Sequence, residues 1–208
     1  MPIKAVIFDL DGTITQPYFD FDAIREEIGL SRNSGPILEA METMSLQQRQ
    51  HAEQILLDHE QEAVMKSKLN TGAKETLSRL REVGISIGVL TRNKRTNAFE
   101  IARKHDLEFD AVIGREDGPV KPDAFGVLQL CRQFGVTPAE TLLVGDYLFD
   151  LLCARAAGAV AVLLANHSQA NEFIEHADFC ISNISEILDI IANKNNVPRI
   201  GRNRKAGL

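Results

Sequence analysis

Short apolar runs alternate with segments of helical period along most of the chain. The runs are nearly continuous in apolar side chains at residues 3–8, 85–90, 111–113, 141–144 and 160–164. Strands that are covered by helices on both faces show this pattern, because neither face of the sheet meets water. We therefore predict a parallel sheet built from these five runs.

The segments between the runs carry apolar residues at helical spacing. The clearest is 73–83, whose apolar side chains fall on one face and which Gly84 follows as a stop. Further helices are predicted from Asn93, as N-cap, to about 105, from Pro122 in a first turn to Gly135, and at 148–157 and 185–192. Strands that alternate with helices predict an α/β fold with a doubly wound, Rossmann-like parallel sheet.

One segment, residues 16–71, interrupts the alternation because it has helical pattern and no convincing strand. Its three helices have predicted N-caps at Asp20 or Asp22, at Ser34, and at Ser45, the last in a capping box with Gln48. We interpret it as a small α-helical cap domain inserted after the first strand. The predicted division is a core domain at 1–15 and 72–192, a cap domain at 16–71 and a basic tail at 193–208.

Charge is distributed unevenly along the sequence. The net charge is −6, from 23 basic and 29 acidic residues, but the segment from Asn193 to the end holds five basic residues and no acidic one. The rest of the chain therefore carries 18 basic against 29 acidic residues. Such an acidic body repels the nucleic-acid backbone, so we expect no nucleic-acid partner. The basic tail is interpreted as a frayed, solvated terminus.

The cellular setting is inferred from cysteines and from apolar runs. Cys131, Cys153 and Cys180 are odd in number and have no CxxC spacing, which predicts buried free thiols in a reducing compartment. No apolar run is long enough to span a bilayer, and the first residues lack a signal-peptide pattern. We expect a cytoplasmic protein without a membrane partner. The sequence does not indicate an oligomeric state.

Chemically reactive residues follow the predicted strands. The first run is followed by Asp9-Leu-Asp11-Gly12-Thr13, the second by Thr91-Arg92-Asn93, and the fourth by Gly145-Asp146, with Asp150 one turn later. Lys121-Pro122 lies between the third run and its helix. Ligands of an open α/β sheet bind beyond the carboxyl ends of its strands, so these side chains are expected at one rim.

Crowded carboxylates are destabilising unless a cation neutralises them. Oxygen ligands without a nearby His or Cys favour Mg²⁺, which is bound by a few carboxylates together with substrate phosphate. A carboxylate can also attack phosphorus, and a second carboxyl can exchange protons with the leaving group and water. Thr91 and Lys121 suit the binding of phosphoryl oxygens.

The ordered motifs resemble the haloacid dehalogenase-like hydrolase superfamily, and the layout is most similar to its phosphoglycolate phosphatase-like enzymes. The resemblance implies a phosphatase with Asp9 as nucleophile, Asp11 as acid/base, and a mobile cap over a small phosphate ester. The implied Mg²⁺ ligands are Asp9, the Asp11 backbone carbonyl, Asp146 and Asp150. The residues expected to bind phosphate are Thr91, Arg92, Lys121 and Gly12, with Lys121 also catalytic.

The sequence departs from the phosphoglycolate phosphatase-like pattern at two places. These differences leave the substrate open, although phosphoglycolate is the ester that the resemblance suggests. Ile14-Thr15-Gln16-Pro17 replaces the usual acidic-then-small pair, and Ala124 stands where a second proline is common. Competing functions are a phosphomutase that uses the same Asp9 and Asp11, and a phospho-signalling receiver module. The receiver is disfavoured because it has no inserted cap and places its phosphorylated Asp on a later strand.

Single motifs also have simpler interpretations. Asp-x-Asp-Gly alone is typical of a turn, Thr91 could cap the following helix, and Asp150 could be a favourable acid at a helix N-terminus. Lys121 alone would be a surface lysine. The functional interpretation depends on finding all these residues at one rim of the sheet.

Overall fold

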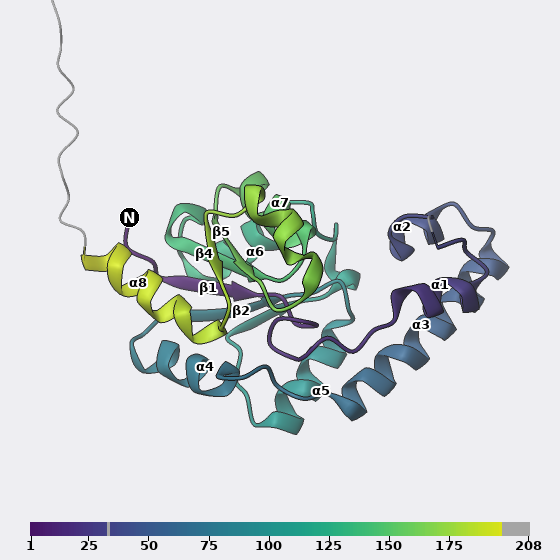
Figure 1. Cartoon of the computed structure of the whole chain (residues 1–208), viewed down its shortest axis with the longest axis horizontal. Helices are drawn as coiled ribbons and strands as arrows, with labels where there is room; N and C mark the ends of the chain where they lie inside the picture. The colour runs from purple at the N-terminus through teal and green to yellow at the C-terminus, as the bar shows by residue number, and fades with distance from the viewer. Residues whose placement is uncertain (33, 197–208) are drawn as a thin grey trace, which may run out of the picture.

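The structure is a computed structural model and describes residues 1–32 and 34–196 of the chain. Six parallel strands form one sheet in the order β3-β2-β1-β4-β5-β6. Figure 1 labels β1, β2, β4 and β5 of this sheet. The strands are β1 (Ala5–Phe8), β2 (Ser86–Leu90), β3 (Ala111–Ile113), β4 (Thr141–Gly145), β5 (Val160–Leu164) and β6 (Phe179–Ile181). The doubly wound α/β fold and its five predicted strands are confirmed. The sixth strand was not predicted, because it has three residues and lies at the sheet edge, where its middle residue is exposed.

Helices cover both faces of the sheet, as Figure 1 shows. One face is covered by α4 (Ala73–Glu82), α5 (Arg95–His105) and α8 (Ile187–Asn196), and the other by α6 (Phe125–Phe134) and α7 (Leu148–Ala157). Short 3-10 turns lie at Arg115–Asp117, Pro138–Glu140, Ser168–His176 and Ile184–Glu186. Alternate residues of β1 pack on opposite faces, with Val6 and Phe8 on the first side and Ile7 on the second. The continuous apolar run therefore reflects burial on both faces.

Three local predictions in the core were wrong. Helix α5 has Lys94 as its N-cap, so Asn93 does not begin it. Helix α6 starts at Phe125, so Pro122 lies before the helix and not in its first turn. Cys131 and Cys153 are buried, but Cys180 is exposed on the edge strand.

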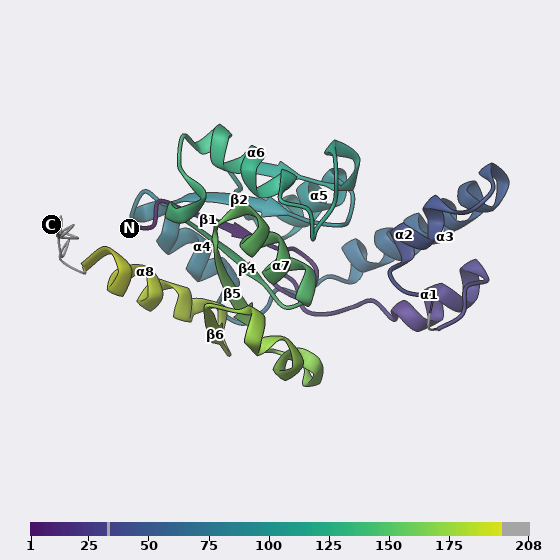
Figure 2. The same ribbon diagram turned by 90° about the horizontal axis from the view of Figure 1, so that it is seen from above.

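Residues 16–71, called the cap segment below, form α1 (Phe21–Ile28), α2 (Ile37–Glu42) and α3 (Leu46–Lys66). Figure 2 shows these helices projecting beyond one end of the sheet. The Asp20 carboxylate caps α1, and Ser45 forms the predicted capping box with Gln48. Ser34 does not cap α2, because Pro36 is the N-cap there.

The two chain crossings between core and cap segment lie side by side. Thr15 and Leu69 form an antiparallel bridge, and the backbone N–H of Gln16 donates to the carbonyl of Lys68 over 2.9 Å. At the other end of the chain, α8 extends four residues into the predicted tail, and the remainder of that tail, 197–208, lies outside the described residues. Among the described helices, none is long and apolar enough to cross a membrane.

Candidate active site

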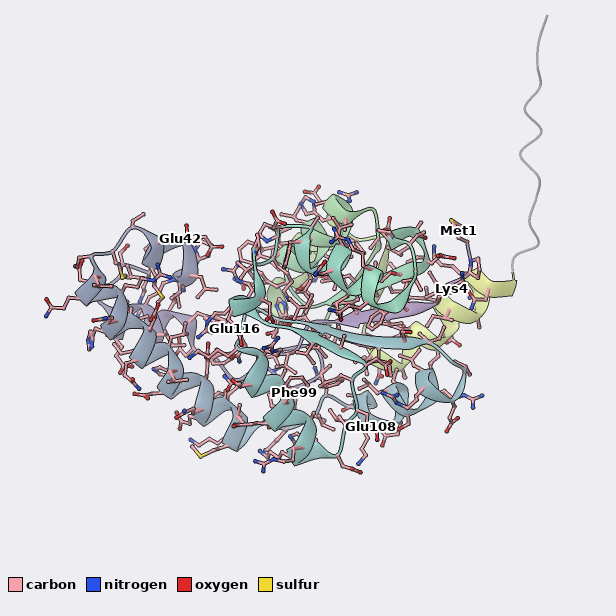
Figure 3. The ribbon with its side chains drawn as sticks, turned by 180° about the vertical axis from the view of Figure 1, so that it is seen from behind. Met1, Lys4, Glu42, Phe99, Glu108 and Glu116 are labelled. Carbon is pink, nitrogen blue, oxygen red and sulfur yellow. The ribbon has the colours of Figure 1, made fainter. Side chains whose placement is uncertain are left out.

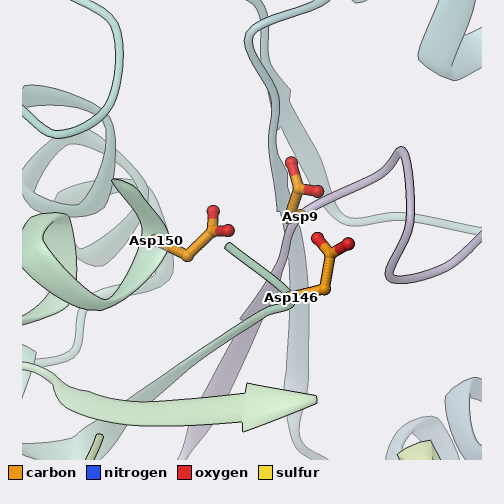
Figure 4. A group of neighbouring side chains, drawn as sticks. All are labelled: Asp9, Asp146 and Asp150. Carbon is orange, nitrogen blue, oxygen red and sulfur yellow. The ribbon is translucent and has the colours of Figure 1, made fainter. Parts of the chain in front are cut away.

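Three carboxylates meet where the strand order of the sheet reverses. Asp9 follows β1, Asp146 follows the neighbouring strand β4, and Asp150 lies in the first turn of α7. Figure 4 shows the three side chains converging, and one oxygen of each lies within 4.8 Å of the others. The parallel register, with Phe8 beside Val144, brings the ends of β1 and β4 to the same level. This reversal point is where open α/β sheets bind ligands.

Lys121 reaches the same cluster from the loop before α6. Its Nζ donates to Asp9 Oδ1 over 2.5 Å and to Asp150 Oδ1 over 2.6 Å. The lysine is 3 % exposed, so these contacts are shielded from water. The structure thus places the predicted lysine between two of the predicted carboxylates.

The cluster holds more negative than positive charge. Burial raises the pKa of Asp9 well above its ordinary value; Lys121 opposes that rise, and the neighbouring Asp150 adds to it. Burial and the Asp150 carboxylate likewise raise the pKa of Asp146 to about 6. Burial would lower the pKa of Lys121, but Asp150 and Asp9 together raise it. One ammonium therefore does not neutralise the carboxylates.

Asp11 lies outside the carboxylate cluster and lines the same cleft. Its Oδ2 accepts a hydrogen bond of 3.1 Å from Asn93 Nδ2. Burial raises the pKa of Asp11, and the Asn93 contact partly opposes this. Asn93 therefore orients a candidate acid/base group and does not begin a helix. Its own amide oxygen accepts from the Lys94 N–H and from Asn97 Nδ2, which fixes the orientation of its side chain.

The loop that carries Asp11 is held tightly against the strand ends. Gly12 has φ 95°, and a Cβ at this position would lie 2.2 Å from Asp146 Oδ2. Asn70 Nδ2 donates to the carbonyls of Gly12 and Thr13, over 2.9 and 2.8 Å, and Asn166 Nδ2 donates to the Gly12 carbonyl over 2.6 Å. Glycine is therefore required here for its backbone conformation and for space.

Thr91 and Arg92 follow β2 and line the cleft. Thr91 is buried, and its hydroxyl accepts a 3.0 Å hydrogen bond from the Asn93 N–H. The guanidinium of Arg92 donates to both carboxylate oxygens of Glu39, over 2.9 and 2.6 Å, and to the carbonyl of Lys121. Arg92, predicted to bind phosphate, thus joins the core to α2 of the cap segment.

The cleft lies between the core and the cap segment and has a volume of about 790 Å³. Its core side contains all the predicted site residues except Gly12, and its cap side contains residues from α1, α2 and α3. A second contact joins the cap segment to the core, where Glu60 of α3 accepts from the Arg115 guanidinium and from Asn97 Nδ2. A cleft of this volume, with the carboxylates in its lining, has room for a small ligand.

Several residues of this site were missed by sequence reasoning. Asn70, Asn93 and Asn166 each donate to the Asp11 loop, and Glu39 binds Arg92. Asparagine is common in turns, so only its position next to a strand end distinguished Asn93. Asn70 and Asn166 lie 58 and 154 residues from Gly12, which gives no local signal.

The chain is similar in sequence and in fold to known hydrolases. Residues 3–158 match the family described as haloacid dehalogenase-like hydrolase. An uncharacterized hydrolase of Saccharomyces cerevisiae is 32% identical over 207 residues, with 93% of each chain covered. A phosphoglycolate phosphatase of Chromobacterium violaceum is 26% identical, covering 92% of this chain and 97% of that one. A crystal structure of a hydrolase from Pseudomonas syringae superposes with a TM-score of 0.78 at 19% identity, covering 91% of this chain and 98% of that one.

Proposed function

Because this chain belongs to the haloacid dehalogenase-like hydrolases, we propose that it is a Mg²⁺-dependent phosphatase acting on a small phosphate monoester through an aspartyl phosphate at Asp9. The observation that carries the proposal is the convergence of Asp9, Asp146 and Asp150 in one cleft, with Lys121 bound to Asp9 and Asp150. Phosphatase names among the relatives support the reaction class.

The donor set fits Mg²⁺. All three clustered groups are carboxylates, which are the ligands that this ion prefers. Burial, and then the neighbouring carboxylates, raise the pKa values of Asp9 and Asp146, and a divalent cation would stabilise the ionised form of both groups. Asp9, Asp146 and Asp150 would hold the ion, with the backbone carbonyl of Asp11 as the further predicted ligand. When bound, Mg²⁺ neutralises the carboxylates and the phosphoryl oxygens of the substrate.

In the first step, an Asp9 carboxylate oxygen attacks phosphorus and the bond from phosphorus to the ester oxygen breaks. The electron pair of that bond goes to the leaving oxygen, which takes a proton from Asp11. The raised pKa of Asp11 favours this role, because the carboxyl then keeps its proton to a higher pH. Asn93 holds Asp11 Oδ2, so it orients the acid toward the cleft.

In the second step, water attacks the phosphorus of the aspartyl phosphate and gives a proton to the Asp11 carboxylate. The bond from phosphorus to Asp9 breaks, which releases inorganic phosphate and restores the Asp9 carboxylate. Lys121 and Thr91 donate to the phosphoryl oxygens in both steps, and Arg92 and Gly12 remain further predicted phosphate contacts. The cap segment limits access of bulk water. The free cysteines fit a reducing compartment such as the cytoplasm.

The test is detection of both the product and the intermediate. Purified protein is incubated with Mg²⁺ and a panel of monoesters that includes phosphoglycolate, the substrate in the name of one relative. We expect free phosphate, and after acid quenching a phosphoryl group on the peptide containing Asp9. An isomerised sugar phosphate would instead indicate a phosphomutase. No phosphoryl transfer from any ester would contradict the proposal.

A further inference from the structure

The cations that line the cleft are already bound to carboxylates. Among the described residues these cations are Arg25, Arg92 and Lys121. Lys121 contacts Asp9 and Asp150 at the phosphoryl end. Arg25 Nη1 lies 3.0 Å from Asp22 Oδ1, and its Nε donates to the Gly35 carbonyl over 3.1 Å. A substrate with a second anionic group, outside the part of the cleft that holds Asp9 and Lys121, would therefore have to displace a protein carboxylate from Arg25 or Arg92.

Arg92 is the cation that connects the core to α2 of the cap segment, and three groups contact its guanidinium. Glu39 accepts from its Nη2 through both oxygens, the carbonyl of Lys121 accepts from Nη1, and its Cζ lies 4.8 Å from the centroid of the Phe149 ring. The Arg92 side chain is 20% exposed and that of Glu39 is 42% exposed. An incoming carboxylate would replace Glu39 while remaining close to its charge, which is unfavourable.

The same cleft is rich in aromatic side chains. The chain has ten Phe, two Tyr and no Trp, and five of these twelve line the cleft. Three of them have large exposed fractions, 39% for Tyr18, 53% for Phe21 and 45% for Tyr147. Exposed rings that gather in one cleft indicate a ligand with an apolar or flat surface.

We propose that the cleft selects phosphate monoesters whose leaving group is uncharged and carries a ring, and that the Glu39–Arg92 ion pair excludes a second anionic group. The proposal rests on the phosphatase function proposed above and narrows its substrate class. It places phosphoglycolate, whose leaving group carries a carboxylate, among the poor substrates. Phe21 and Tyr147 provide ring surfaces for the leaving group, and the Glu39 carboxylate repels a leaving group that is negatively charged.

The experiment compares two esters that differ in one carboxylate. Benzyl phosphate and 4-carboxybenzyl phosphate have the same ring and the same type of alcohol leaving group. For the wild-type protein we expect kcat/KM to be at least about 10-fold higher for benzyl phosphate. Replacing Glu39 by Gln frees Arg92 to bind the carboxylate, and the ratio should shift by about 10- to 100-fold toward the carboxylated ester.

Two further variants complete the test. Glu42→Gln removes one negative charge from the same helix at an exposed position, labelled in Figure 3, and should leave the ratio unchanged. Phe21→Leu keeps an apolar side chain without the ring, and should lower kcat/KM for benzyl phosphate about 3- to 10-fold relative to ethyl phosphate.

The proposal is overturned if the wild-type protein hydrolyses 4-carboxybenzyl phosphate or phosphoglycolate as well as benzyl phosphate. An unchanged ratio in Glu39→Gln, or an equal change in Glu42→Gln, would also overturn it. A wild-type protein that releases phosphate from none of these esters, nor from p-nitrophenyl phosphate, contradicts the phosphatase function itself. The two failures are therefore distinguishable.

Discussion

The two sides of the cleft are built by different means. On the core side, Asp9, Thr91 and Asp146 directly follow neighbouring strands and are nearly buried. On the cap side, Tyr18 and Phe21 are exposed, and Glu39 is positioned by a six-residue helix. Side chains fixed by a sheet have few alternative positions, whereas exposed side chains on short helices can be exchanged at low cost. We propose from this comparison that the core carries the chemistry and that the cap segment contributes most of the selectivity.

The attachment of the cap segment shows the same contrast. Its helix α3 is fixed at the carboxyl end, where Lys104 Nζ donates to the carbonyls of Val64 and Met65 over 3.0 and 2.6 Å. One turn earlier in α3, Glu60 is bound by Arg115 and is almost fully buried. Helix α2 is held to the core through the more exposed Glu39–Arg92 pair. Helix α2 is thus held to the core by a more exposed contact than helix α3.

Asp9→Asn gives the largest expected effect, because it removes the nucleophile. We expect kcat toward p-nitrophenyl phosphate to fall about 10⁴-fold or more, with no phosphoryl group trapped on the protein. Steady-state kinetics and acid-quench mass spectrometry measure this. Asp189→Asn, an exposed acid on α8, is the matched control and should keep wild-type activity. Appreciable turnover by Asp9→Asn would show that Asp9 is not the nucleophile.

Asp11→Asn should separate the two chemical steps. Toward an alkyl phosphate, whose leaving oxygen needs a proton, kcat should fall by about 10²–10⁴-fold. Toward p-nitrophenyl phosphate the leaving group is a stable anion, so a burst of p-nitrophenol should precede slow turnover. Stopped-flow absorbance detects the burst, and phosphoryl groups should accumulate on Asp9. Equal slowing on both esters without a burst would mean that Asp11 is not the acid/base.

Chelation of Mg²⁺ tests whether a divalent cation neutralises the carboxylate cluster on the core side. EDTA should reduce turnover of p-nitrophenyl phosphate about 100-fold or more, and added Mg²⁺ should restore it. Because binding to the folded state stabilises it, Mg²⁺ should also raise the Tm of the wild-type protein and have less effect on Asp146→Asn. Calorimetry with and without Mg²⁺ provides that readout. Full activity in EDTA would contradict a metal-assisted mechanism.

Replacement of the cap segment addresses the other side of the cleft. The crossings at Gln16 and Lys68 are hydrogen-bonded neighbours, so a short Gly-Ser linker can join them. We expect kcat/KM for benzyl phosphate to fall about 100-fold because water enters the site and the leaving group is no longer positioned. The ratio between benzyl and 4-carboxybenzyl phosphate should approach one. If this protein keeps the wild-type ratio, selectivity resides in the core.

The smallest expected effect is a pH dependence of stability in EDTA. The folded-state pKa of Asp146, about 6, lies above its ordinary value, so its contribution to stability is present at low pH and lost as pH rises through about 6. Between about pH 5 and about pH 7.5 the loss is on the order of 1 kcal/mol, or about 2–4 °C in Tm. Asp146→Asn should lack this part of the slope. If Tm changes equally with pH in the two proteins, the pKa of Asp146 is not raised in the folded state.

The sequence determined the parts of this protein that are encoded locally. Apolar runs located five strands, because burial on both faces excludes polar residues from them. The Ser45 capping box and the Asp20 cap were readable, because such hydrogen bonds join residues two or three positions apart. Asp9, Asp146 and Lys121 could be placed together, because the carboxyl ends of parallel strands share one edge of a sheet.

The tertiary structure alone decided which side chains meet across long separations. Arg92 and Glu39 are 53 residues apart, and Arg115 and Glu60 are 55 apart, so nothing near any of them in the sequence marks its partner. The sequence offered Arg92 as a phosphate ligand, and only the packing of α2 against the core revealed that Glu39 binds its guanidinium. Side chains that chain folding brings together depend on the docking of whole helices, which no local pattern records.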